Sequence, residues 1–175
     1  AVIAMEASGL HSNGYSLVRH VLLNTAQWSL DKDVPDLGRT LGAELLEPTR
    51  IYAKACLELA DRTEVHAMSH VTGGGLAANL ARVMPAELMA TIERGTWTPQ
   101  PIFDVVRRVG AVSQPDLEAT LNCGVGMVAV MAPSEMDRAI EVLAGFGIRA
   151  WVAGEVTVDP EQQGRVVLEG QHPGW

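Results

Sequence analysis

Two glycine-rich loops, each carrying one histidine, constrain this chain more than any other feature. The first loop is Ser8-Gly-Leu-His-Ser-Asn-Gly-Tyr15 and the second is Ser69-His-Val-Thr-Gly-Gly-Gly-Leu76. Each loop follows a short apolar run that predicts a strand and leads into a run that predicts a helix. This order gathers backbone N–H groups around one concave spot, which suits a phosphate or another oxyanion. The sequence therefore predicts a site for a phosphorylated small molecule.

Length and composition narrow the class of protein. A chain of 175 residues is long enough for one sizeable domain, and its net charge of −8 argues against a general nucleic-acid-binding surface. No apolar run approaches the roughly 20 residues of a membrane helix, and no signal segment is present. Cys56 and Cys123 have no disulfide or zinc-type spacing, so we expect both to be reduced, in a cytoplasmic protein. Because Ala1 leads directly into a strand, we expect an excised domain without its N-terminal neighbour.

The periodicity of apolar residues predicts an α+β fold. The segment 27–40 is polar and predicts a loop, and residues 45–50 predict an extended stretch before and after Pro48. The last two predicted strands are expected to form a hairpin around Asp159 and Pro160. We expect a mixed, largely antiparallel sheet of about six strands flanked by helices. Predicted strands cover 2–5, 65–68, 88–93, 126–131, 151–158 and 165–169, and helices cover 15–24, 51–59, 76–84, 102–109, 116–121 and a segment that starts at 134.

The first loop offers polar groups and bare backbone together. Ser8, Ser12 and Asn13 can donate or accept hydrogen bonds, while Gly9 and Gly14 allow positive φ and close approach of a ligand. A tight strand–helix connection with an incidental His11 explains the same residues. From this loop alone, the binding site and the simple connection remain equally good interpretations.

The second loop favours the binding site. Gly73, Gly74 and Gly75 are consecutive and lose much backbone entropy on folding, beside His70 and Thr72. A flexible linker is the alternative, but a linker is not expected between a strand and an amphipathic helix. We predict that this loop binds the phosphate or ribose of the substrate, and that His11 and His70 face one cleft.

Several other features carry less information. The stretch Asn122–Met127 is a third glycine-rich turn, which by itself indicates a turn or bulge. His20 and His66 are expected to face solvent or to be satisfied locally, and His172 lies in the tail. The chain has no Walker A loop, no nucleophile elbow and no HExxH motif.

Four ordered motifs resemble one known family. Ser8–Arg19 is similar to the segment that opens the C-terminal domain of phosphoribosylformylglycinamidine cyclo-ligases, also called AIR synthetases. Leu45–Tyr52, His70–Leu76 and Asn122–Met127 resemble the same family in the same order, as does Gly154–Val156. The chain departs from the family at two positions, where Leu121 replaces a usual Phe and Cys123 a usual Met.

The resemblance implies a specific reaction. Members of this family close the imidazole ring of formylglycinamidine ribonucleotide to give aminoimidazole ribonucleotide, at the expense of ATP. It also implies an N-terminal domain, outside this sequence, that forms a homodimer core and supplies most of the Mg-ATP site. The chain itself is then expected to hold the phosphorylated ribonucleotide, to have no metal site and to be inactive alone. Another enzyme of the superfamily that phosphorylates a small-molecule oxygen, or a non-catalytic binding module of the same fold, remains an alternative.

Two sets of site residues follow from the loops and the resemblance. His11 and His70 are the predicted catalytic residues, which could orient the formamide or move a proton. The predicted substrate-binding residues are Ser8, Gly9, Ser12, Asn13, Gly14, Thr72, Gly73, Gly74, Gly75 and Asn122. We also expect apolar surface near the N-terminus and these loops, where the missing domain would be in contact.

Overall fold

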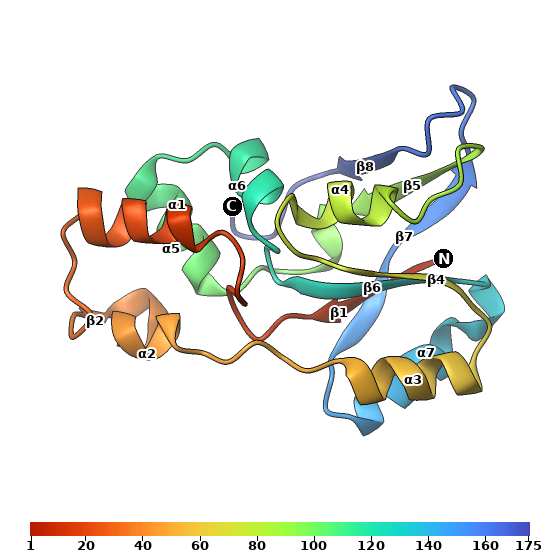
Figure 1. Ribbon diagram of the computed structural model, residues 1–175, viewed down its shortest axis with the longest axis horizontal. Coiled ribbons are helices and arrows are strands. Elements are labelled where there is room, and N and C mark those ends of the chain that lie inside the picture. Colours follow the sequence, from red (N-terminus) through yellow and green to blue (C-terminus); the bar gives the residue numbers. More distant parts are fainter.

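A six-stranded sheet organises the computed structural model, which describes residues 1–175 (Figure 1). The strand order is β4-β6-β1-β7-β5-β8, and every neighbouring pair is antiparallel except the parallel pair β5–β8. The mixed, largely antiparallel sheet and the α+β class are therefore confirmed. The strands are β1 (Val2–Glu6), β4 (Val65–His70), β5 (Leu88–Glu93), β6 (Val125–Met131), β7 (Ala150–Val158) and β8 (Val166–Glu169), with a separate small ladder of β2 (Asp33–Val34) and β3 (Arg39–Thr40).

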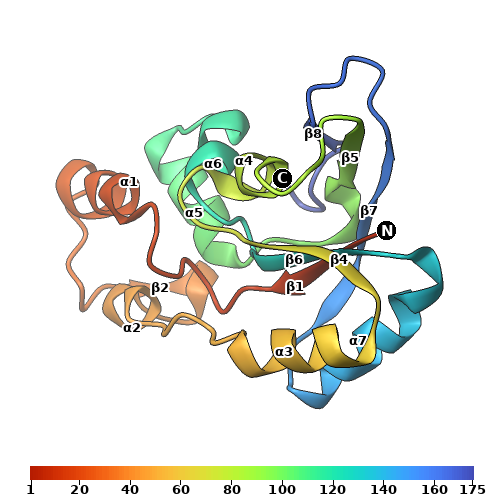
Figure 2. The ribbon, with the colours of Figure 1, turned by 45° about the vertical axis from the view of Figure 1, so that its right-hand side comes forward.

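Helices cover both faces of the sheet. α3 and α7 lie side by side on one face, and α4 lies on the other (Figures 1 and 2). α6, α5 and α1 continue beyond the end of the sheet as a helical lobe. The helices are α1 (Tyr15–Arg19, continued by a π-helical segment His20–Thr25), α2 (Leu41–Leu45), α3 (Ala53–Arg62), α4 (Gly75–Ala81), α5 (Pro101–Gly110), α6 (Gln114–Thr120) and α7 (Met136–Gly145).

β1 shows why the sheet needs both helical layers. Its residues form a continuous apolar run because both of its faces are buried. Val2 and Ala4 pack into the core beneath α4, whereas Ile3 and Met5 pack into the core beneath α3 and α7. A third core, which includes Phe103 of α5, fills the helical lobe. The first glycine-rich loop connects the sheet to this lobe.

The last strand is placed differently from the sequence-based expectation. The predicted β7–β8 hairpin is wrong, because β8 pairs in parallel with β5 on the far side of that strand. The connecting loop 159–165 passes across the start of β5, where Asp159 N–H donates to the Glu87 carbonyl. The buried Asp159 carboxylate accepts the backbone N–H groups of Glu161 and Gln163 and holds this wide turn.

The polar segment 27–40, which was predicted to be a loop, contains more secondary structure than expected. Residues 27–40 include β2, a single 3₁₀ turn over Pro35–Leu37 and β3, and α2 then occupies Leu41–Leu45. Thr40 caps α2 by accepting the Ala43 N–H. The other predicted elements are found at closely similar bounds.

The helix lengths and the two cysteines complete the description of the fold. No helix combines the length and the apolar composition needed to cross a lipid bilayer. Cys56 and Cys123 are both free thiols, as the sequence predicts. Burial raises the pKa of each thiol.

Candidate functional site

The two histidine loops emerge at the same edge of the sheet. β1 and β4 both pair antiparallel with β6, so β1 and β4 point in the same direction (Figure 1). The loops that follow them therefore meet where β6 begins. A Cβ atom added to Gly73 would lie 3.7 Å from Asn13 Oδ1, so the two loops touch. The two loops therefore lie at one end of the sheet, as the prediction that His11 and His70 face one cleft requires.

His11 is buried within the first loop. The Ser8 N–H donates to His11 Nε2 at 3.1 Å, which assigns the proton of the neutral ring to Nδ1. Only 5% of His11 is exposed, and Nδ1 is buried with no hydrogen-bond partner in the chain. Burial, followed by the charges of His70 and Arg50, lowers the pKa of His11 to about 4. His11 is therefore a neutral side chain at physiological pH.

His70 ends β4 and is exposed, opposite Met127 of β6. The Tyr52 ring connects the two histidines, with its centroid 6.0 Å from that of His11 and 6.3 Å from that of His70. The Tyr52 hydroxyl donates to the Glu6 carbonyl at 2.7 Å, just before the first loop. Burial raises the pKa of this phenol, so it stays protonated.

Tyr52 is not among the site residues predicted from the sequence. Its only signal was its place at the end of the family motif Leu45–Tyr52. Gly126 completes this arrangement, because a Cβ there would lie 1.9 Å from the Tyr52 hydroxyl and 2.8 Å from His11 Cε1. The glycine of the third turn is thus required for two other side chains to approach β6.

The serines of the first loop contact the segment before α3. Ser8 Oγ donates to the Pro48 carbonyl at 2.6 Å, and Ser12 Oγ lies 3.0 Å from Thr49 Oγ1. Next along this segment, Arg50 Nη1 donates to the Gly147 carbonyl at 3.0 Å. The family motif around Pro48 is therefore one wall of the site.

Asn122 ties the third turn to the first loop. Its side-chain amide donates to the carbonyls of Gly9 at 2.9 Å and Leu10 at 3.2 Å, and its Oδ1 accepts the Gly124 N–H at 2.8 Å. The side chain is buried and its bonding capacity is largely used. In this structure Asn122 supports the loop that was predicted to bind substrate.

Two of the predicted binding glycines meet tight packing requirements. A Cβ on Gly14 would lie 2.1 Å from Leu121 Cδ2, and one on Gly75 would lie 1.6 Å from the Glu118 carbonyl oxygen. Both residues also have positive φ, of 78° and 72°. These positions need glycine for folding, whatever they bind.

The carbonyl groups of the second loop point toward its own helix. Asn79 Nδ2 donates to the carbonyls of Thr72, Gly73 and Gly75, and the Thr72 hydroxyl donates to Asn79 Oδ1. The N–H groups of Gly73 and Gly74 have no acceptor within the protein. The same is true of the N–H groups of Asn13 and Gly14 in the first loop. Four free donors from two touching loops suit an anionic ligand.

A half-buried ion pair supports α6 behind these loops. Arg94 donates two hydrogen bonds to the Glu118 carboxylate, at 2.7 and 2.8 Å. Burial opposes ionisation of Glu118, but the hydrogen bonds from Arg94, His172 and Gln114 outweigh it and lower its pKa to about 2. The pair holds the backbone against which Gly75 packs.

Comparison with known proteins decides the family. Residues 1–167 match the family model described as AIR synthase related protein, C-terminal domain. The chain belongs to this family. A Streptomyces fradiae protein provisionally named phosphoribosylformylglycinamidine cyclo-ligase is 61% identical over 157 residues, which are 90% of this chain and 86% of that protein.

Other cyclo-ligases of the family are longer. Those of Symbiobacterium thermophilum and Thermoanaerobacter sp. are 41% and 39% identical, over 96% of this chain in each case. The chain covers only 48% and 49% of their lengths, so it spans about half of these curated relatives.

Solved structures support the fold alone. The chain matches thiamine-monophosphate kinase from Stenotrophomonas maltophilia with a TM-score of 0.62 at 17% identity, over 97% of this chain and 50% of that one. It matches the E. coli hydrogenase maturation protein HypE with a TM-score of 0.57 at 19% identity, over 96% and 46%.

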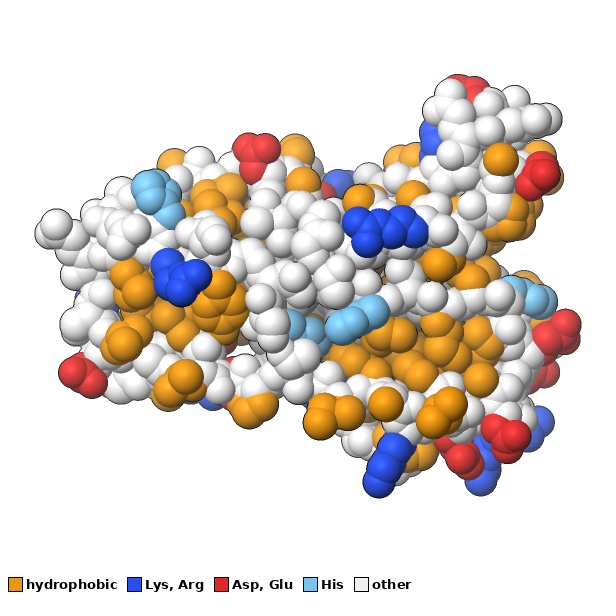
Figure 3. Space-filling model, in the orientation of Figure 1, with side chains coloured by type: hydrophobic (Ala, Val, Ile, Leu, Met, Phe, Trp, Pro, Cys, Tyr) orange, Lys and Arg blue, Asp and Glu red, His pale blue; other side chains and the backbone are white.

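The surface of this AIR synthase family domain has apolar regions over β4 and α3 and beside Ala1. Figure 3 shows apolar surface beside histidine side chains, in the region of β4 and α3. Met68 and Met127 are among the partly buried side chains that pack against the core there. A second apolar groove of about 520 Å³ lies beside Ala1 and includes Val83, Met84 and Leu88.

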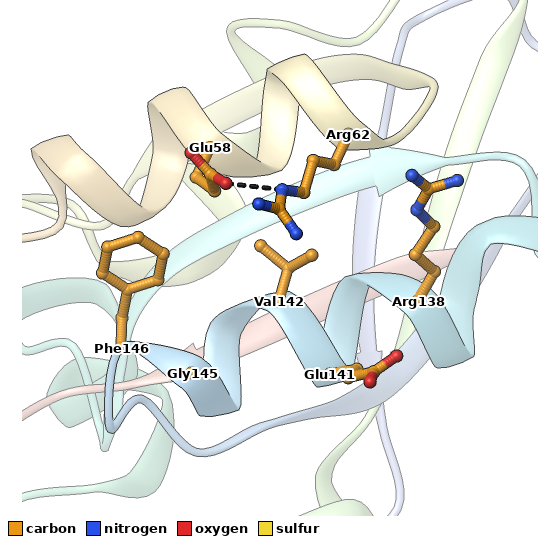
Figure 4. A pocket seen from close by; sticks show the side chains of 7 residues that line it. All are labelled: Glu58, Arg62, Arg138, Glu141, Val142, Gly145 and Phe146. Atoms are coloured by element: carbon orange, nitrogen blue, oxygen red, sulfur yellow. Dashed lines mark ion pairs between the residues drawn. The ribbon is translucent and has the colours of Figure 1, made fainter.

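A polar groove between α3 and α7 holds none of the predicted site residues. Its volume is about 350 Å³, and side chains from both helices line it (Figure 4). Glu58 and Arg62 form an ion pair of 2.5 Å within α3 at its edge. Its lining residues are Glu58, Arg62, Arg138, Glu141, Val142, Gly145 and Phe146.

Proposed function

We propose that this chain is the substrate-side domain of a cyclo-ligase in purine biosynthesis. The reaction would close the imidazole ring of formylglycinamidine ribonucleotide to give aminoimidazole ribonucleotide, and the complete enzyme would depend on ATP. Membership of the AIR synthase family and the 61% identity to the Streptomyces protein support this proposal. The observation that carries it is the meeting of two histidine loops with unused N–H donors at one edge of the sheet.

The loops suit two parts of such a substrate. The free N–H groups of Asn13, Gly14, Gly73 and Gly74 can hold a phosphate or the ribose hydroxyls without any cationic side chain. The exposed His70 imidazole can donate a hydrogen bond to the formamide oxygen or accept one from the amidine. Ring closure requires an amidine nitrogen to attack the formamide carbon and to lose its proton, while the formamide oxygen, phosphorylated by ATP, would leave as phosphate. By holding the amidine and the formamide in place, the loops would account for part of the rate of ring closure.

Magnesium and ATP do not fit the residues of this chain. No group of three or more His, Cys, Asp or Glu side chains is arranged to hold a metal ion. Mg²⁺ with a triphosphate needs carboxylates near the phosphates, and neither glycine loop contains one. We therefore assign both to the other half of a longer enzyme, of the kind seen in the longer relatives.

A chimeric enzyme tests this proposal. The C-terminal half of the Thermoanaerobacter cyclo-ligase is replaced by this chain, and conversion of formylglycinamidine ribonucleotide is measured with ATP. We expect the chimera to form aminoimidazole ribonucleotide and the 175-residue chain alone to form none. Product formed by the isolated chain would contradict the assignment of magnesium and ATP to the other half of the enzyme.

A further measurement separates the alternatives. A folded chimera that binds the ribonucleotide but never turns it over would favour a non-catalytic binding module. A chimera that consumes ATP with a different phosphate acceptor would favour another enzyme of the superfamily. The native Thermoanaerobacter enzyme is the positive control for both assays.

A further inference from the structure

The structure gives the two histidines very different surroundings. His70 is exposed at the end of β4, whereas 5% of His11 is exposed and its free ring nitrogen is sealed from solvent. A substrate can reach His70 without any rearrangement of the chain. It cannot reach His11 Nδ1 unless the first loop opens.

The hydrogen bonds of His11 also indicate that this residue does not contact the substrate. Its one basic nitrogen, Nε2, already accepts the Ser8 N–H at 3.1 Å. The remaining nitrogen carries a proton and has no partner. His11 also holds φ at +57°, a conformation that few residues other than glycine adopt. These features fix the path of the loop and leave no lone pair for proton abstraction.

Tyr52 joins this support to His70. Its ring lies beside both imidazoles, and its hydroxyl donates a hydrogen bond to the Glu6 carbonyl at the start of the first loop. Only 6% of Tyr52 is exposed. The absence of a side chain at Gly126 lets the phenol and His11 lie against β6. One rigid ring thus contacts the loop, the strand and the exposed histidine.

We propose that His70 is the histidine that contacts the substrate, and that His11 and Tyr52 are positioning residues that fix the His70 imidazole from behind. This assignment rests on the proposed function. Tyr52 thereby gains a role in the site. His11, which the sequence predicted as a second catalytic residue, becomes a structural support instead. The ligand that His70 meets is the amide or amidine end of an anionic ribonucleotide, next to the free N–H groups of the loops.

Chemical labelling tests the access of each histidine. Diethyl pyrocarbonate modifies neutral imidazoles, and peptide mass spectrometry assigns the modified sites on the 175-residue chain. His20 and His66 are exposed and provide internal standards. We expect His70 to react at their rate, and His11 to react at least about tenfold more slowly, because it must wait for local opening. Labelling of His11 at the rate of His20 would overturn the proposal.

Substitutions in the chimeric enzyme test the positioning role. His11→Gln keeps an acceptor for the Ser8 N–H but changes the packing of the ring, so it should lower kcat severalfold with KM changed much less, whereas His70→Ala should lose most of kcat. Tyr52→Phe keeps the ring but loses the hydrogen bond to the Glu6 carbonyl, so it should lower kcat less than Tyr52→Leu does. Tyr52→Leu should lower kcat by about tenfold, with KM changed much less, because misplaced groups slow the chemical step. Equal losses for His11→Gln and His70→Ala would overturn the assignment.

Protection by substrate separates this proposal from the proposed function. In the chimera, formylglycinamidine ribonucleotide should slow the labelling of His70 and leave His66 unchanged. An active chimera whose His70 is not protected would refute the role of His70 while the function stands. An inactive chimera would refute the proposed cyclo-ligase function. Slow labelling of His11 in the same chimera would still support the buried position of His11 behind His70.

Discussion

The two glycine-rich loops have similar sequences but are held in different ways. The first loop is bound by residues far away in the chain: Asn122 holds two of its carbonyls, and the Pro48–Thr49 segment contacts its serines. The second loop is bound by Asn79, four to seven residues further along the chain. The first loop is therefore part of the scaffold, whereas the second presents exposed backbone from its own helix.

The difference teaches that glycine has several separate functions within one motif. Gly14 and Gly75 allow close packing, Gly74 adopts a positive φ of 100°, and Gly73 is exposed and lies beside Asn13. Single substitutions can separate these functions, because each should disturb folding or binding to a different degree.

Gly75→Ala should have the largest effect. The added methyl group would lie 1.6 Å from the Glu118 carbonyl oxygen, at a residue with φ of 72°. Backbone on both sides must move, so we expect a loss of about 3 kcal/mol or more in unfolding free energy. Urea unfolding measures it. Gly145→Ala is the matched control, because a Cβ there meets nothing within 4 Å and φ is ordinary. A Gly75→Ala chain as stable as the control would show that α4 and α6 are not in close contact.

Asn122→Ala should have the next largest effect on stability. It leaves the Gly9 and Leu10 carbonyls and the Gly124 N–H without partners in a buried region. We expect a loss of about 3 kcal/mol in unfolding free energy, since unpaired buried groups cost about 1–3 kcal/mol. Asn13→Ala is the control, because this asparagine makes no hydrogen bond within the chain through its side chain. An equal change in both variants would mean that the first loop is not held from a distance.

This contrast also explains how far the sequence alone could lead. The strands, most helices and the meeting of both loops at one edge follow from local periodicity and from strand direction. The partners of the first loop do not, because Asn122 and Thr49 are brought to it only by the folded sheet. The role of Tyr52 is not predictable for the same reason, since no local pattern places it beside both His11 and His70.

The error at the last strand has a similar origin. Two neighbouring strands joined by Asp159 and Pro160 suggest a hairpin, but long-range hydrogen bonds to residues 86, 87 and 90 carry the chain across β5. The packing role of Gly75 was likewise invisible, because the backbone of Glu118 approaches it from another helix. Local signals predict the presence of elements, but contacts between distant segments decide what each residue does.

A pH titration should isolate the buried histidine of the first loop. The pKa of His11 is lowered to about 4 in the folded chain, so the unfolded chain, with a histidine pKa near 6.5, binds the proton more tightly. Stability due to this neutral ring is present above pH 6.5 and is lost as the pH falls toward 4. Between pH 7 and pH 5 the loss should be about 2 kcal/mol. Urea unfolding of His11→Gln should lack this loss.

His66→Gln provides the comparison for that titration, because His66 is exposed. It should keep the full pH dependence of the unaltered chain. The measurement stays above pH 5 so that Glu118, whose pKa is lowered to about 2, contributes little. An unchanged pH dependence in His11→Gln would show that the first loop is more open to solvent than the structure indicates.

The smallest effect on stability should come from Gly73→Ala, which is also the sharpest test of ligand binding. Its φ is ordinary and its Cβ would lie 3.7 Å from Asn13 Oδ1, so unfolding free energy should change by less than about 0.5 kcal/mol. Gly74→Ala, with φ of 100°, should lose about 1 kcal/mol. In the chimera, Gly73→Ala should still weaken binding of the ribonucleotide, because the methyl group stands beside the free N–H donors. Calorimetric titration measures this affinity. Unchanged affinity in both variants would mean that the exposed backbone of the second loop does not meet the ligand.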